Sequence, residues 1–216
     1  IEKKKPEFVL NVDESGFIDF VDRKKETVIV PFNTPDDMVL GCKRNNKRAT
    51  MIGAIFMDGS KLKPLIIIPN KRIEKDLMLN GYGENNVLIV TQECGFLNSN
   101  IFSYWADNIL FPEVNRRRQI TGYTGDVLLL LDGCSSHFSD YFLDNCTYYG
   151  IYVFQEPPGS SDQFQALDLG IFGIQKHFKS QVRISNDLSQ QSKNIIQIVN
   201  SWILSTMPDK VVSAFN

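Results

Sequence analysis

Apolar residues in the first half of the chain fall into short runs separated by turn residues. Short runs rich in β-branched and aromatic residues, bounded by Gly, Pro, Asn or Asp, predict β-strands. Ser15-Gly16 predicts a turn between the first two strands, and Asp58-Gly59-Ser60 predicts the turn of a hairpin. The predicted strands are residues 8–12, 17–21, 49–57, 62–68 and 87–91.

From Asn98 onward the apolar spacing becomes helical. Ile101, Tyr104 and Trp105 fall on one face, with Asn98 or Ser99 placed to cap the helix. Residues 127–131 are apolar without alternation, which predicts a strand covered on both faces. Further elements are expected at 139–149 (helix), 151–154 (strand), 167–182 (helix) and 192–205 (helix). This order predicts an α/β fold: a mixed sheet of three antiparallel strands and then parallel strands, with helices on both faces.

Composition limits the function classes. The 216 residues are 43% hydrophobic and 22% charged, with a net charge of −2, which suits one folded domain over residues 1–216. The apolar runs are too short to span a bilayer, so no membrane partner is expected. Four scattered cysteines and two histidines do not suit a zinc site. No Walker loop, GxGxxG turn or GxSxG elbow is present, which disfavours nucleotide-cofactor enzymes and serine hydrolases.

Three aspartates stand at the ends of apolar segments: Asp13, Asp132 and Asp168. Strand ends in an open α/β sheet gather at one edge, where like charges repel and a cation would hold them ionised. Oxygen ligands suit Mg²⁺ or Mn²⁺. Two such ions about 4 Å apart can activate a water or a 3′-hydroxyl and stabilise the leaving oxygen of a phosphodiester. Each aspartate taken alone is a turn residue as readily as a ligand.

Three further residues are accessory candidates. Glu14 follows Asp13 and is expected on the other face of the strand, behind the metal ligands. Glu156 competes with Asp168 for the third ligand position, and Asp162 does so more weakly; Asp168 is preferred because a helix would present it rigidly. His137 could contact a phosphate or assist proton transfer, or it could simply cap a helix from its loop.

Basic clusters are candidates for contacts with a phosphate backbone, although any one of them could equally be solvated surface. The pI of about 5.7 argues against a dedicated nucleic-acid-binding module but is compatible with a nuclease. The candidate DNA contacts are Lys43, Arg44, Lys47, Arg48, Arg116, Arg117 and Arg118.

The motifs around the three aspartates resemble the DDE-superfamily endonuclease domain of pogo, Tigger and jerky-type transposases, relatives of centromere protein B. The matching stretches are Asn11-Val12-Asp13-Glu14-Ser15-Gly16-Phe17, Leu131-Asp132-Gly133-Cys134-Ser135-Ser136-His137, and residues 165–172 with Lys176. The resemblance covers residues 8–179 and leaves 180–216 as a C-terminal helical extension. Asp132 and Asp168 are separated by 35 residues, similar to the spacing in DDE/D enzymes.

The resemblance implies a ribonuclease H-like fold with Asp13, Asp132 and Asp168 as metal ligands for two Mg²⁺ or Mn²⁺ ions. It implies cleavage and strand transfer of DNA in the nucleus, with DNA and a second copy of the chain as partners. The chain begins at Ile1, so we expect a segment of a longer protein whose helix-turn-helix region is absent here.

The chain also departs from the family pattern. Cys134 stands where the family usually has His, and residues 160–166 replace a Thr-Ser-His…Gln-Pro stretch. Two alternatives therefore stay open: a domesticated, non-catalytic DNA-binding or chromatin protein that keeps the fold, and a nuclease of the same fold that hydrolyses strands without joining them.

Overall fold

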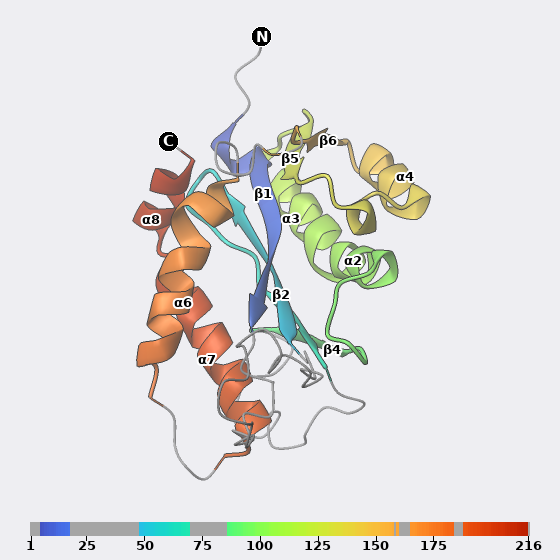
Figure 1. Cartoon of the computed structure of the whole chain (residues 1–216). Helices are drawn as coiled ribbons and strands as arrows, with labels where there is room; N and C mark the ends of the chain where they lie inside the picture. The colour runs from blue at the N-terminus through green and yellow to red at the C-terminus, as the bar shows by residue number, and fades with distance from the viewer. Residues whose placement is uncertain are drawn as a thin grey trace, which may run out of the picture.

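A mixed β-sheet runs through the centre of the molecule (Figure 1). The computed structural model describes residues 5–17, 48–69, 86–157, 159, 165–183 and 188–215. Within them the strand order is β4-β3-β2-β1-β5-β6. Neighbours β1, β2 and β3 pair antiparallel, whereas β5 and β6 continue from β1 in parallel and β4 lies parallel to β3. The strands are β1 (Val9–Phe17), β2 (Ala49–Phe56), β3 (Leu65–Ile68), β4 (Leu88–Thr91), β5 (Val127–Leu131) and β6 (Ile151–Gln155).

Helices cover both faces of this sheet, as predicted. In Figure 1 the green and yellow helices α2, α3 and α4 lie on one side, and the orange and red helices α6, α7 and α8 lie on the other. π-helical segments continue α2 into α3 and open α6. Short 3₁₀ turns are η1 (Pro6–Phe8) and η5 (Ser135–His137). The longer helical elements are α2 (Ser99–Trp105), η4 (Ala106–Leu110), α3 (Phe111–Thr121), α4 (Asp140–Tyr148), η6 (Leu167–Ile171), α6 (Phe172–Gln181), α7 (Gln190–Ser205) and α8 (Pro208–Ala214).

Side-chain caps explain where several helices begin. Asn98 accepts a hydrogen bond from the backbone N–H of Ile101, and Ser139 and Ser189 cap α4 and α7 in the same way. Pro208, which follows the last predicted helix, occupies the first turn of α8, where its missing N–H costs nothing. No helix in the described part of the chain is long and apolar enough to cross a membrane.

The first strand corrects a prediction. Ser15-Gly16 is not a turn, because β1 continues through both residues to Phe17. Its pairing with β2 is unbroken from Leu10 opposite Phe56 to Phe17 opposite Ala49. Ladder hydrogen bonds along a long neighbouring strand thus override the local turn preference of Ser and Gly. Asp13 consequently lies within the strand rather than at its end, and residues 18–47 lie outside the described structure.

Two apolar cores lie on opposite faces of the sheet. One packs β1, β2 and β5 against α2, α3 and α4 around Trp105. The other packs β2 and β3 against α6, α7 and α8 around Trp202. Trp202 lies directly against Gly53 of β2, where a Cβ atom would come within 2.8 Å of its ring. The glycine therefore makes room for the indole, whose N–H donates to the Leu62 carbonyl at 3.2 Å.

Strand β5 is covered less completely than its sequence predicts. Val127, Leu129 and Leu131 are buried in the first core, but Leu128 and Leu130 on the other face are only half-buried. On the same face of β6, Tyr152 and Phe154 are 62% and 40% exposed. The expected double coverage is therefore wrong for this strand, because Leu128 and Leu130 belong to neither packed core.

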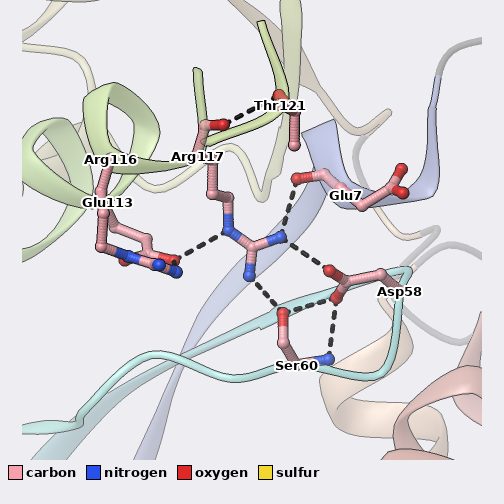
Figure 2. A network of polar contacts seen from close by, with 7 residues as sticks. All are labelled: Glu7, Asp58, Ser60, Glu113, Arg116, Arg117 and Thr121. Carbon is pink, nitrogen blue, oxygen red and sulfur yellow. Dashed lines mark hydrogen bonds and ion pairs between the residues drawn. The ribbon is translucent and has the colours of Figure 1, made fainter. Parts of the chain in front are cut away.

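A buried arginine links helix α3 to the turn that follows β2 and to the segment that precedes β1 (Figure 2). Arg117 donates to Glu113 Oε1 at 2.9 Å, to Asp58 Oδ2 at 2.7 Å and to the Glu7 carbonyl at 2.9 Å, and it also donates to Ser60. Its guanidinium lies 3.6 Å from the centroid of the Phe56 ring. Because these acceptors come from three segments, one side chain fixes their relative positions.

Candidate metal centre

The neighbouring strands β1 and β5 bring Asp13, in the middle of β1, near Asp132, just after the end of β5. Their parallel register pairs Asn11 with Leu130, and each aspartate follows two residues later. Alternate residues of a strand share a face, so Asp13 lies on the same face as Asn11. Asp13 is 6% exposed within β1, whereas Asp132 comes directly after β5 and is partly exposed.

Asn11 fixes the third aspartate relative to the first. Its Oδ1 accepts a hydrogen bond from the Leu167 backbone N–H at 3.0 Å, and its Nδ2 donates to the Leu130 carbonyl at 3.3 Å. The side chain is fully buried. One amide therefore joins β1, β5 and the start of η6, the helical turn that carries Asp168.

Gln165 lies between Asp13 and Asp168. One atom of its amide is 3.1 Å from Asp13 Oδ2 and 2.9 Å from Asp168 Oδ2, and both partners are acceptors. The atom is therefore assigned as the amide nitrogen, which has one hydrogen for each carboxylate. The two carboxylate oxygens, which share this partner, are at most 6.0 Å apart.

Burial and neighbouring carboxylates raise the pKa of Asp13 and of Asp168. Burial, followed by the charge of Asp168, raises the pKa of Asp13 to about 8, with smaller contributions from Glu14 and Asp132. Burial and the Asp132 charge raise the pKa of Asp168, and Lys176 opposes the change. This is the electrostatic environment in which a bound cation would keep the carboxylates ionised.

Asp132 is paired with a buried histidine. His137 is fully buried and its Nε2 lies 2.8 Å from Glu14 Oε1. Its Nδ1 lies 2.8 Å from Asp132 Oδ1, as a charge pair outside hydrogen-bond geometry. Burial alone would lower the pKa of His137, but Asp132 and Glu14 outweigh it and raise the pKa to about 10. His137 also lowers the pKa of Asp132, so the pair is charged at neutral pH.

The contacts of His137 bear on the roles expected for it. The ring is fully buried in η5, between two carboxylates, and lies just before the Ser139 cap of α4. Glu14 lies behind the site, as predicted, bonded to this histidine. Potential ligand atoms of Glu14, Asp132 and His137 all lie within 4.8 Å of one another, the one such group of three found among the described residues.

Glu156 supplies a fourth carboxylate to this site. It follows β6, its backbone N–H donates to the Leu131 carbonyl at 2.9 Å, and its side chain is buried. Within the described residues, its Oε1 has no hydrogen-bond partner. Burial and the charge of Asp132 raise the pKa of Glu156 to about 6, with a further contribution from Asp168. Its competitor Asp162 lies outside the described structure.

The expected ligands are carboxylates, with an unpaired buried oxygen on Glu156 nearby. The oxygens of Asp13, Asp132 and Asp168 do not all lie within 4.8 Å of one another, so a cation shared by the three would draw them closer together. Such oxygens suit Mg²⁺ or Mn²⁺ rather than a thiolate-preferring metal.

The family described as "DDE superfamily endonuclease" matches residues 45–211, more than half of the chain. The chain belongs to this family. Asp132 and Asp168 lie inside the matched span, and Asp13 precedes it. Comparison with curated proteins found no match.

Solved structures of Mos1 transposase share this fold. The DDE domain superposes on the Mos1 paired-end complex with the left transposon end at a TM-score of 0.57 and 14% identity, covering 99% of this chain and 52% of that one. For the Mos1 catalytic domain with Raltegravir and Mg, the TM-score is 0.55 at 15% identity, with 99% and 79% covered. The chain thus spans about half the length of Mos1 in the paired-end complex. The fold is ribonuclease H-like, as the resemblance implied.

The basic residues of the DDE domain divide into three groups. Lys43, Arg44 and Lys47 lie outside the described structure. Arg48 is exposed, with its guanidinium 4.3 Å from the centroid of the Phe96 ring. The remaining three, on α3, all make contacts within the chain.

Arg117 is buried in the network of Figure 2. Arg118 donates to the carbonyls of Tyr149, Gly125 and Gly150. Arg116 pairs with Glu113 at 2.7 Å but keeps 57% of its side chain exposed. Arg117 and Arg118 therefore have structural roles, and Arg116 is the member of the triplet that faces solvent.

Sequence reasoning missed Asn11 and Gln165 as parts of the DDE site. Asn11 stands two residues before Asp13, and this alternation was a signal that both lie on one face of the strand. Gln165 stands three residues before Asp168, where a side chain can reach back across the start of a helix. Neither pattern could reveal which atoms they contact.

Proposed function

We propose that this DDE domain is a divalent-metal-dependent DNA endonuclease and strand transferase of the transposase type. Asp13, Asp132 and Asp168 would bind Mg²⁺ or Mn²⁺, two ions in the loaded site. The observation that carries the proposal is the pair formed by buried Asp13 and exposed Asp168, bridged by one amide atom beside Asp132, with the pKa of Asp13 raised to about 8. A DNA substrate is supported by the family and by the fold shared with a transposase that was solved with a transposon end.

Each part of the site has a distinct task in this proposal. The bound metal supplies a polarised water or 3′-hydroxyl and charge stabilisation for the leaving oxygen. Asp13 and Asp168 would hold the cation, and Asn11 keeps β1 and the start of η6 together. His137 and Glu14 orient the Asp132 carboxylate from behind. Glu156 offers a further oxygen or accepts a proton at the same site.

Replacing Asp132 by Asn tests the assignment. Cleavage of a supercoiled plasmid in the presence of Mn²⁺ should fall by at least about 100-fold, because one charged ligand of the site is lost. Asp144→Asn, an exposed change on α4, is the matched control and should cleave like wild type. If Asp132→Asn cleaved as well as wild type, the site would have been misassigned.

Two further measurements separate this proposal from its alternatives. A non-catalytic DNA-binding protein with this fold would need no Mn²⁺ binding that depends on the carboxylates, and isothermal titration of wild type against Asp132→Asn measures that dependence. A nuclease that only hydrolyses would nick DNA but give no joined product with a 3′-hydroxyl donor end. Joined product that requires Asp132 supports strand transfer.

A further inference from the structure

The amide of Gln165 lies between two carboxylates, in a position that a cation or a water molecule could otherwise occupy. The side chain is 2% exposed and precedes the helical turn η6. Its backbone carbonyl accepts from the Leu169 N–H at 3.0 Å, so the residue is held as the first turn of that helix. Its amide nitrogen lies 3.1 Å from Asp13 Oδ2 and 2.9 Å from Asp168 Oδ2.

The two hydrogens of one amide nitrogen match the two carboxylates. Each hydrogen bond has an ionisable acceptor, and such bonds are stronger than those between neutral groups. Without a donor between them, these two carboxyl groups, at most 6.0 Å apart across their shared partner, would repel each other whenever both are ionised. Gln165 is thus a neutral bridge that lets the carboxylates stay together without a metal.

A cation and this amide nitrogen cannot hold the same two oxygens in the same way. A cation between Asp13 and Asp168 repels the partly positive N–H₂ group, so the amide must turn or withdraw. We propose that Gln165 is a built-in placeholder for the divalent cation: it bridges Asp13 and Asp168 in the metal-free site and gives up both hydrogen bonds when metal binds. This inference rests on the proposed metal-dependent function and adds a residue that sets the affinity for metal.

The placeholder role also explains why the acidic side chains of the site form two pairs, each bridged by one side chain. A side-chain nitrogen lies between the members of each pair: Gln165 between Asp13 and Asp168, and His137 between Glu14 and Asp132. The difference is position. His137 lies behind the site, whereas the neutral amide of Gln165 lies between two of the predicted ligands.

The test is the affinity of the whole chain for Mn²⁺, measured by isothermal titration and by the thermal shift that Mn²⁺ produces. Gln165→Leu removes the bridge, so the metal-free protein loses two hydrogen bonds that the metal-bound protein does not make. Mn²⁺ should therefore bind about tenfold tighter than to wild type, the equivalent of one hydrogen bond to a charged group. Gln165→Glu adds a carboxylate and should tighten binding further, while lowering the melting temperature measured in EDTA.

Gln175→Leu is the matched control. Gln175 is a fully buried glutamine on α6 whose amide donates to Met51 Sδ and to the Ile198 carbonyl, away from the carboxylates. Its replacement should lower the melting temperature equally with and without Mn²⁺ and leave the Mn²⁺ affinity unchanged. If Gln165→Leu does not fold, Gln165→Asn, shorter by one methylene, breaks the bridge with a smaller change in volume.

The outcomes separate the two proposals. Wild-type Mn²⁺ binding that disappears in Asp132→Asn, with tighter binding in the Gln165 variants, supports both. Weaker or unchanged Mn²⁺ binding in the Gln165 variants, while wild type binds, overturns the placeholder alone. Absence of carboxylate-dependent Mn²⁺ binding in wild type overturns the proposed function and the placeholder with it.

Discussion

Replacing Asp13 by Asn should stabilise the metal-free protein at neutral pH, although it removes a predicted metal ligand. Asp13 is 6% exposed, and burial together with the Asp168 charge raises its pKa from 3.8 to about 8. The folded state therefore binds this proton more tightly than the unfolded state does. Between pH 3.8 and about 8 the folded state carries more protons, so stability falls as the pH rises through that window.

The magnitude follows from the width of the window. From pH 3.8 to pH 7 is roughly 3.2 pH units, and each is worth about 1.36 kcal/mol, so burying Asp13 without metal destabilises the fold by about 4 kcal/mol at most. Asn has nearly the same shape, is neutral at every pH, and can still accept from the Gln165 amide. The Asp13→Asn protein should therefore gain a large part of this free energy at pH 7.

Urea unfolding in EDTA at several values between pH 5 and pH 8 measures the effect. His137, with its pKa raised from 6.5 to about 10, makes stability fall between those pH values in both proteins. The pKa of Glu156 is raised from 4.5 to about 6, so this residue makes stability fall between pH 4.5 and 6 in both proteins. The difference in the free energy of unfolding between the two proteins isolates the contribution of Asp13, and it should grow with pH. A constant difference, or a variant less stable than wild type at pH 8, would refute the reasoning.

Two paired substitutions test the scaffold by urea unfolding. Arg117→Leu should lower the free energy of unfolding by about 3 kcal/mol, because it leaves buried acceptors without their cation. Arg116→Leu, next to it, should lower it by at most about 1 kcal/mol. Equal losses for the two variants would show that the network of Figure 2 does not stabilise the fold. Gly53→Ala should cost about 1–3 kcal/mol because its Cβ would overlap the Trp202 ring. In Gly173→Ala on α6 the added Cβ meets nothing within 4 Å, so the free energy of unfolding should stay unchanged or rise by up to about 1 kcal/mol. A Gly53→Ala protein as stable as wild type would mean that the Trp202 ring has space to move.

Elements with a strong local signal were predictable. Strand β5, the capped helices α2 and α4, and the hairpin turn at Asp58 were expected from apolar spacing, cap residues and turn residues, and each was confirmed. The continuation of β1 through Ser15 was not predictable, because its ladder partner β2 is more than thirty residues away in the sequence. The half-covered face of β5 escaped prediction for the same reason: coverage depends on where helices far along the chain pack.

The sequence by itself predicted which residues carry the chemistry and determined the family. Asp13, Asp132 and Asp168, and the family to which the chain belongs, are local patterns of residue type and spacing. Only the tertiary structure decided how these carboxylates are partnered: Asp132 with buried His137, and Asp13 with Asp168 through Gln165, with Glu156 beside them. It also placed Arg117 in a structural network rather than on the surface. The reason is physical: burial and the charges of distant residues set hydrogen bonds and pKa values, and both exist only once the strands and helices have packed.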